Sequence, residues 1–294
     1  MAIGIALTVA AATGYTVNTL FLALLGRRAG FTTTKYIFLI ALAANLLIHL
    51  IVFGRPFPSF ERIEYLLYLG ASGIIGYVLG YVAMIAALPL IGPRLVLLLL
   101  TSQTAMSFFA GWAVLGETLN PLGYLYVVMV MAGIILAILN KRVSVEDRRH
   151  LTTGILFSLA LGFCQTLSQF LSKKALLGGI TPLSAKTTRL NFATVGVFIF
   201  AAAAGHRIGV RVSDLQRQDW LKITLAALVG PVLSVFLSFT ALKFITLGVA
   251  AAMLQLSPVL MLFLARIVFK EKIKPVAVLG TLLAVSGTVL LALS

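Results

Sequence analysis

The stretch LVLLLLTSQTAMSFFAGWAVLGETLNP, residues 95–121, has an echo in AAAMLQLSPVLMLFLARIVFKEKIKP, residues 250–275. Each is a long apolar run that ends in a short charged connection and a proline. A shift of 154 residues places Glu117 on Glu271 and Pro121 on Pro275 without a gap. Because Glu and Pro are rare in so apolar a chain, the match indicates an internal repeat rather than chance agreement among Leu and Ala.

The same shift extends the repeat in both directions. It places Gly76 on Gly230, Ala87-Leu88 on Ala241-Leu242 and Gly133 on Gly287. The first apolar run aligns less cleanly, with a shift of 148 residues that places Gly14-Tyr15 on Gly162-Phe163. We therefore expect two repeats, residues 1–140 and 151–294, joined by a charged linker at 141–150.

The composition of the chain excludes a water-soluble protein. Of 294 residues, 61% are hydrophobic and only 11% are charged, whereas a soluble domain is about 25% charged. Disorder requires the opposite balance, and the single Cys164 cannot form an internal disulfide. The net charge of +15 comes from Lys and Arg in short segments between apolar runs, where anionic lipid head groups are the natural partners. We expect an integral membrane protein that does not bind nucleic acid.

A bilayer core about 30 Å thick requires about 20 apolar residues per helix. Ten such runs cover residues 2–25, 34–53, 65–88, 93–115, 122–139, 151–172, 182–204, 219–243, 246–268 and 274–293. The predicted fold is therefore an all-α integral membrane protein with ten transmembrane helices. Because each repeat holds five helices, an odd number, the second repeat enters the membrane from the opposite side. Inverted repeats of this kind are typical of secondary transporters, whose substrate site lies near the midplane and is exposed to each side in turn.

The segment from Leu95 to Pro121 and its echo from Ala250 to Pro275 resemble the EamA-type repeats of the drug/metabolite transporter superfamily. The matching motifs are Leu115-Gly116-Glu117 in the first, and Ser257-Pro258 with Lys270-Glu271 in the second. The resemblance implies a multi-pass transporter of a bacterial or archaeal plasma membrane that needs no cofactor and is not an enzyme. Members export amino acids and other metabolites, while related branches exchange nucleotide sugars or phosphorylated sugars. Thr104, in place of the usual proline, and Lys270, in place of a glycine, depart from the pattern. The resemblance leaves the oligomeric state, monomer or homodimer, open.

The charges inside the apolar runs indicate the sign of the substrate. All eight Asp and Glu fall in loops or at helix ends, so the carboxylates that usually carry protons or sodium are missing from the interior. Their absence favours facilitated diffusion or exchange, although His49 remains a candidate proton carrier beside its simpler interpretation as an interfacial imidazole. Lys186 and Arg189 lie within the seventh run and share one helix face. Arg189 also matches an arginine that EamA-type repeats commonly carry early in their second helix.

We predict that Arg189, assisted by Lys186, attracts a carboxylate or phosphate of the substrate, because a guanidinium binds such groups with two parallel hydrogen bonds. The alternative is that both side chains extend to lipid head groups. Polar side chains in other runs are candidates for lining the substrate path. They are Tyr15, Asn18, Tyr77, Tyr81, Gln103, Gln165, Gln169 and Gln255.

Small residues and prolines predict where helices approach closely and where they bend. Gly76 and Gly80, with the echo Gly230, indicate close helix packing. Pro231 and Pro258 predict kinks in the eighth and ninth helices, because proline lacks an N–H donor and its ring clashes with the preceding turn. Kinks confined to the second repeat would make that half a candidate gate; the alternative is a static bend.

The function that these features favour is secondary transport of a small amphipathic metabolite, amino-acid-like or an organic anion, by alternating access. One alternative is an exchanger of nucleotide sugars or sugar phosphates, which would need a denser basic cavity. Another is a non-transporting scaffold or lipid-handling protein. The sequence has no Cys/His metal spacing, no phosphate-binding glycine loop and no Ser/His/acid arrangement, so we expect no metal, cofactor or catalytic residue.

The orientation in the membrane is predicted in two ways that disagree. Of the 23 Lys and Arg residues, 16 lie in the odd-numbered connections. The positive-inside rule therefore places these connections in the cytoplasm and both termini outside. The family resemblance instead implies cytoplasmic termini.

Overall fold

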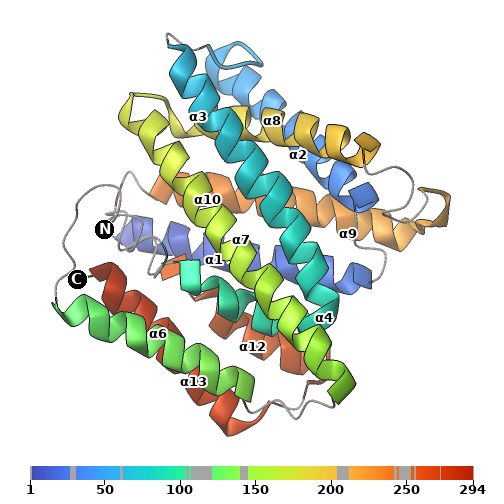
Figure 1. Cartoon of the computed structure of the whole chain (residues 1–294). Coiled ribbons are helices and arrows are strands. Elements are labelled where there is room, and N and C mark those ends of the chain that lie inside the picture. The colour runs from blue at the N-terminus through green and yellow to red at the C-terminus, as the bar shows by residue number, and fades with distance from the viewer. Residues whose placement is uncertain are drawn as a thin grey trace.

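Helices form all of the regular structure described in the computed structural model, and no strand occurs among those residues (Figure 1). The structure describes residues 2–26, 31–59, 62–103, 106, 121–139, 145–203, 212–241, 244, 253–254, 256–271 and 273–293. The predicted all-α fold is confirmed for this part of the chain.

The helices follow the predicted apolar runs closely. In chain order they are α1 (Ala2–Leu25), α2 (Phe31–Phe53), α3 (Ile63–Gly73), the π-helical turn η2 (Ile74–Leu79), α4 (Gly80–Leu100), α6 (Pro121–Leu139), α7 (Val145–Leu177), α8 (Pro182–Ala203), the short 3-10 turn η4 (Val212–Asp214), α9 (Arg217–Ala227), the π-helical turn η5 (Leu228–Ser234), α10 (Val235–Ala241), α12 (Ser257–Val268) and α13 (Pro275–Leu293). The predicted break at residues 89–92 lies inside α4. There Gly92 has a φ of 81°, in the left-handed region that glycine adopts readily, and Pro93 follows.

Five helical segments are long and apolar enough to cross a membrane. They are Ala2–Leu25, Thr32–Phe53, Ile63–Leu100, Arg149–Leu176 and Arg217–Ser238. The helix α8 has 22 residues but is not among them, and Lys186, Arg189 and Asn191 make its first half more polar. The chain therefore has the helices of a multi-pass membrane protein, while the count of ten spans stays a prediction.

Two π-helical turns lie at matching positions in the two halves of the chain. The turn η2 begins at Ile74 and η5 begins at Leu228, which is the shift of 154 residues that aligns the sequence repeats. Pro231 lies inside η5, whereas the matching position of η2 is Tyr77. The irregular turn is therefore present in both halves, so proline is not required for it; a kink and a gate at Pro231 stay a prediction. Such turns are frequent at functional sites.

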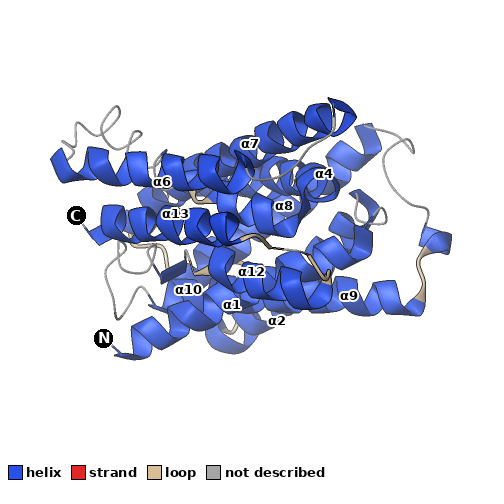
Figure 2. Cartoon of the chain, turned by 90° about the horizontal axis from the view of Figure 1, so that it is seen from below, coloured by secondary structure: helices blue, strands red, loops and turns tan. Residues whose placement is uncertain are grey.

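The helices α6 and α13 lie side by side (Figures 1 and 2), and two glycines allow their close approach. A Cβ atom on Gly133 would collide with the backbone of Gly280 and Ala284. A Cβ on Gly287 would lie 2.9 Å from Tyr126 O and 2.9 Å from Val130 N. The two glycines that the repeat aligns therefore play the same role on opposite helices.

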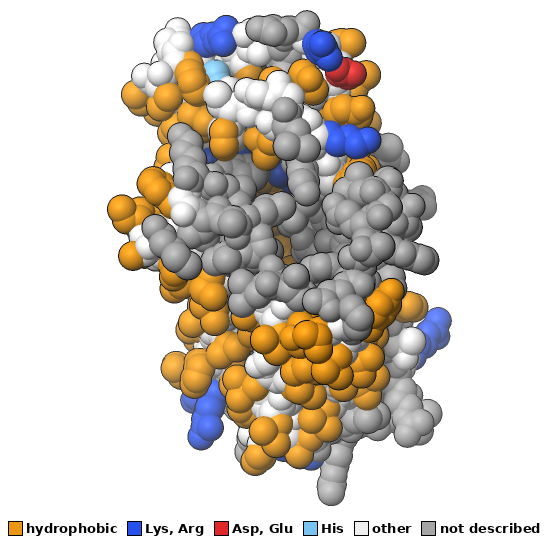
Figure 3. Space-filling view, turned by 90° about the vertical axis from the view of Figure 1, so that its left-hand side faces the viewer, with side chains coloured by type: hydrophobic (Ala, Val, Ile, Leu, Met, Phe, Trp, Pro, Cys, Tyr) orange, Lys and Arg blue, Asp and Glu red, His pale blue; other side chains and the backbone are white. Residues whose placement is uncertain are grey.

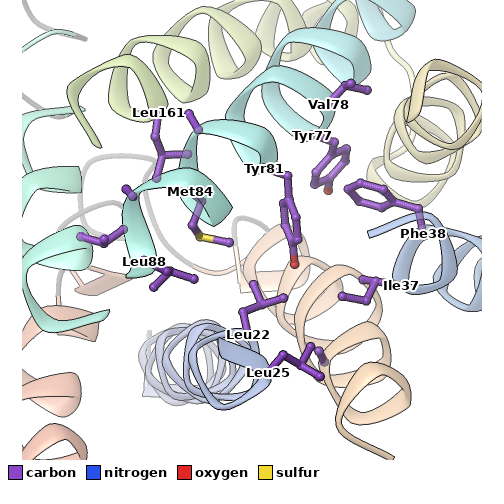
Figure 4. Packing of buried hydrophobic residues seen from close by; sticks show 14 of the residues in the cluster. Leu22, Leu25, Ile37, Phe38, Tyr77, Val78, Tyr81, Met84, Leu88 and Leu161 are labelled. Carbon is purple, nitrogen blue, oxygen red and sulfur yellow. The ribbon is translucent and has the colours of Figure 1, made fainter. Parts of the chain in front are cut away.

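Apolar side chains fill the middle of the bundle and also cover its outside. Figure 4 shows Phe38 of α2 beside Tyr77 and Tyr81, with Leu22 of α1 below them. Large apolar residues such as Ile51 and Phe163 are exposed, and hydrophobic atoms cover much of the lower half of the surface in Figure 3. An outer surface of this kind suits lipid. Both termini lie at the same end of the bundle (Figures 1 and 2).

Candidate functional site

Arg189 lies two turns into α8 and is buried, with 5% of its surface exposed. Its Nη2 donates a hydrogen bond of 2.9 Å to Ser168 Oγ of α7. The guanidinium carbon lies 4.9 Å from the centroid of the Tyr77 ring in η2, a cation–π arrangement. Its Nε is buried and has no hydrogen-bond partner among the described residues. The guanidinium therefore has an unused donor.

Three serines form a buried hydrogen-bonded group beside this guanidinium. Ser72 Oγ of α3 lies 2.9 Å from Ser168 Oγ and 2.7 Å from Ser172 Oγ, and Ser168 Oγ donates to Ser72 O at 2.8 Å. A Cβ on Gly76 would collide with the Ser168 side chain and would lie 3.5 Å from Arg189 Nη2. The absence of a side chain at Gly76 therefore makes room for the serine that holds Arg189. Sequence reasoning did not select these serines; the spacing of Ser168 and Ser172 by one helical turn is the signal that could have found them.

Lys186 is even more deeply buried, with 1% of its surface exposed. Its Nζ donates a hydrogen bond of 2.8 Å to the carbonyl oxygen of Val232 in η5, and it lies 5.4 Å from the centroid of the Phe236 ring. Lys186 and Arg189 thus start from one helix face but contact different helices. Neither side chain is exposed, which argues against the alternative that they extend to lipid head groups.

No carboxylate whose side chain the structure describes pairs with either of these two cations. Glu64 pairs with Arg62, Asp219 with Lys222 and Glu271 with Arg94, while Asp214 lies in η4 and Glu146 and Asp147 lie at the start of α7. The prediction that acids lie at helix ends and connections is confirmed for these six. Two buried positive charges therefore have no protein counter-ion in the part of the chain that is described.

A second polar group connects α1 to α4 and α10. Asn18 Nδ2 donates to Tyr81 Oη at 3.1 Å, and Tyr15 Oη lies 3.5 Å from Ser238 Oγ. A Cβ on Gly230 would lie 2.6 Å from Asn18 Cγ, so the glycine of η5 receives the Asn18 side chain as Gly76 of η2 receives Ser168. The prediction of close packing at both glycines is confirmed.

The four predicted glutamines are distributed differently. Gln165 Nε2 donates to Gly76 O at 3.1 Å, and a Cβ on Gly80 would lie 3.2 Å from the same Nε2. Gln103 lies near α7, because its main-chain carbonyl oxygen accepts a hydrogen bond from Thr166 Oγ1. Gln169 is exposed and makes no described hydrogen bond to the group around Arg189. Gln255 lies outside the described residues.

Two further residues singled out in the sequence have structural partners. Pro258 lies in the first turn of α12, so it begins that helix rather than bending its middle, and the preceding Ser257 donates to Ala12 O of α1.

His49 is fully buried rather than exposed at an interface. Its Nδ1 lies 2.7 Å from Arg55 O and its Nε2 lies 3.1 Å from Ser184 Oγ, so both ring nitrogens are engaged.

The family model of EamA-like transporters matches residues 2–139 and, a second time, residues 152–293. The chain belongs to the EamA-like transporter family. Membership of this family, in the drug/metabolite transporter superfamily, confirms the resemblance that the sequence motifs indicated. This EamA-like transporter is an integral, multi-pass membrane protein whose environment is lipid and whose partner is a small-molecule substrate.

Solved structures support the fold of this EamA-like transporter. A crystal structure of a protein aligns over 97% of this chain and 94% of its own length, with a TM-score of 0.68 and 16% sequence identity. At this identity the match shows a shared fold alone. No protein of curated function matches the sequence. The polar groups around Arg189, Lys186 and Tyr81 lie between helices from both segments that the family model matches, which makes them the candidate substrate site.

Proposed function

We propose that this EamA-like transporter is a secondary carrier that moves a small amphipathic metabolite with an anionic group, amino-acid-like or an organic anion, as an exporter or exchanger in a bacterial or archaeal plasma membrane. Residues 1–140 and 151–294 form two inverted repeats of five membrane-spanning helices. Alternating access exposes the site between the repeats to each side in turn.

The buried guanidinium of Arg189, which has no counter-ion among the described residues, is the observation that carries this proposal. A buried ion without a counter-ion costs several kcal/mol, and a charge of this kind is retained where it has a function. A carboxylate of the substrate would supply the missing charge and would accept a hydrogen bond from the free Nε. The Tyr77 ring, which covers one face of the guanidinium, would fix its plane for a two-pronged contact.

Three observations support inverted repeats and alternating access. The family model matches twice in succession, the two π-helical turns lie at matching positions, and both termini lie at one end of the bundle (Figure 1).

The experiment is a thermal-shift measurement on the purified protein with leucine, benzenesulfonate, glucose 6-phosphate and a cationic dye. We expect the anion or the amino acid to stabilise the wild type by mass action. Arg189→Gln should weaken this binding about tenfold or more, because it removes a charge-assisted hydrogen bond worth about 1.5–3 kcal/mol. Arg62→Gln, which alters an exposed arginine, is the matched control and should bind normally. Stabilisation by the cationic dye alone would contradict the proposal.

A sugar-phosphate exchanger is the second candidate, because two buried cations on one helix face also suit the double charge of a phosphate. It predicts that glucose 6-phosphate gives the largest stabilisation and that phosphate esters on one side of a liposome accelerate efflux from the other. Stabilisation by leucine or benzenesulfonate without any effect of glucose 6-phosphate would favour the first candidate.

A further inference from the structure

The ammonium group of Lys186 has fewer partners than it can use. An ammonium has three N–H donors, and the described residues supply one acceptor, Val232 O, and the face of the Phe236 ring. A neutral amine needs no more than this, since one N–H can still donate to the carbonyl. The same contact therefore serves the side chain in both protonation states.

The helices packed around α8 bring no described carboxylate to Lys186. These elements are α2, α3, η2, α7 and α10. The segment from Leu228 to Ala241 has no titratable residue. On the other elements, Lys35 and Lys174 lie over aromatic rings, His49 is bonded to Arg55 O and Ser184 Oγ, Tyr77 lies under Arg189, and Glu64 is exposed beside Arg62. The remaining titratable residues are Tyr36 on α2, Tyr65 and Tyr68 on α3, and Glu146, Asp147, Arg148, Arg149, His150, Cys164 and Lys173 on α7.

Burial of an ammonium without a counter-ion is unfavourable, and such a group tends to lose its proton instead. Arg189 cannot respond in this way, because a guanidinium stays protonated in proteins. Of the two buried cations, Lys186 is therefore the one whose charge can change with occupancy of the site. An anion beside Lys186 would favour the ammonium, and departure of the anion would favour the amine.

We propose that Lys186 carries one proton together with each anion, which makes the protein an anion–proton symporter; the role rests on the proposed function. When the anion leaves, one N–H bond of the ammonium breaks, the electron pair remains on Nζ and the proton passes to water on the open side. When an anion binds, Nζ takes a proton from water on that side. The carbonyl acceptor belongs to the π-helical turn η5, so the change of charge takes place at an irregular turn of the second half.

The test uses full-length protein in liposomes and benzenesulfonate, which stays ionised at all working pH values and crosses lipid slowly. Two activities are measured: exchange of labelled for unlabelled benzenesulfonate at equal pH, and net uptake driven by an acidic exterior, followed with a trapped pH dye. Lys186→Arg keeps the positive charge but cannot release a proton. Lys35→Arg makes the same substitution on α2 and is the matched control.

We expect wild type and Lys35→Arg to show exchange and uptake with acidification of the interior. Lys186→Arg can lower both activities, but net uptake driven by the pH gradient should fall at least about tenfold more than exchange does, because exchange needs only the charge whereas coupled uptake needs release of a proton. The role of Lys186 would be overturned if proton movement persists in Lys186→Arg, or if net uptake by the wild type does not depend on the pH gradient. Either result would leave the proposed carrier function intact. Absence of exchange in the wild type would overturn the proposed function and, with it, this role.

Discussion

Arg94 and Glu271 form an ion pair that links the two segments matched by the family model. Arg94 Nη2 lies 2.8 Å from Glu271 Oε1, and Nε donates to the same oxygen at 3.1 Å. Arg94 follows the turn at Gly92-Pro93 in α4, and Glu271 follows α12. Arg94 is nearly buried, and its Nη1 has no described partner. A single carboxylate thus neutralises a buried arginine across the boundary between the two halves.

Glu271→Gln should destabilise the protein because it leaves the Arg94 charge buried and unpaired. Loss of one partner of a fully buried pair costs about 3–5 kcal/mol. The Glu271 side chain is 37% exposed, so solvent screening reduces the expected cost to about 1–3 kcal/mol. The measurement is thermal unfolding in detergent, with Glu64→Gln of the exposed Arg62 pair as the control. Equal shifts of the unfolding temperature in the two variants would show that the Arg94–Glu271 pair stabilises the protein no more than the exposed Arg62–Glu64 pair does.

Gly76→Ala should impair transport more than it impairs folding. The added methyl group would collide with Ser168, whose Oγ accepts the hydrogen bond from Arg189, and overpacking of this kind costs about 1–3 kcal/mol. We expect net transport to fall about tenfold while the protein still purifies as a folded species. In Gly162→Ala the new methyl lies 3.2 Å from Ser102 Oγ, a milder contact, so this variant is the control. Normal transport by Gly76→Ala would mean that the Arg189 position does not limit transport.

The positions of most helices could be predicted from the sequence, because a bilayer requires long apolar runs whatever their neighbours are. The run 2–25 coincides with α1, and the repeat aligns Gly133 with Gly287, which both lie at the close contact of α6 with α13. Arg189 was selected because a charge inside an apolar helix is conspicuous. Features that depend on the length of a helix or on an unusual residue can therefore be predicted from the sequence.

The direction in which each helix face points could not be predicted. Lipid tails are as apolar as the protein interior, so hydrophobic periodicity does not separate the inside of a membrane helix from its outside. The sequence makes Gln169 as good a candidate as Gln165, yet Gln169 is exposed while Gln165 donates to Gly76 O. Ser168 and Ser172 are one helical turn apart, but serine is small and only mildly polar, so this spacing alone does not distinguish a binding group from helix packing, and Ser72 lies on another helix. Their hydrogen bonds arise only when α3 and α7 meet.

Tyr81→Phe should test the hydrogen bond between α4 and α1. The substitution removes the Oη that accepts from Asn18 Nδ2 and leaves a buried amide without that partner. An unsatisfied buried polar group costs about 1–3 kcal/mol, so we expect a lower unfolding temperature. Tyr15→Phe removes a hydroxyl whose contact with Ser238 is longer, at 3.5 Å, and should have the smaller effect. The reverse order would show that Tyr15, not Tyr81, secures α1.

Ser168→Ala should weaken substrate binding through Arg189 without touching the substrate. Ser168 Oγ accepts the only described hydrogen bond of the guanidinium, so its loss frees Arg189 to move over the Tyr77 ring. A hydrogen bond to a charged group contributes about 1.5–3 kcal/mol. If substrate binding must reorient Arg189 at the cost of part of this free energy, KM should rise about threefold to tenfold. The maximal rate should change little, since the guanidinium itself remains.

Ser172→Ala is the matched control for this prediction. Ser172 belongs to the same serine group and bonds to Ser72 at 2.7 Å, but no described contact joins it to Arg189. Both variants remove one buried hydroxyl, so their unfolding temperatures should fall by similar amounts. Only Ser168→Ala should raise KM in liposome transport. If both variants raise KM equally, the serine group acts through general packing of α3 against α7, and Ser168 does not position the guanidinium.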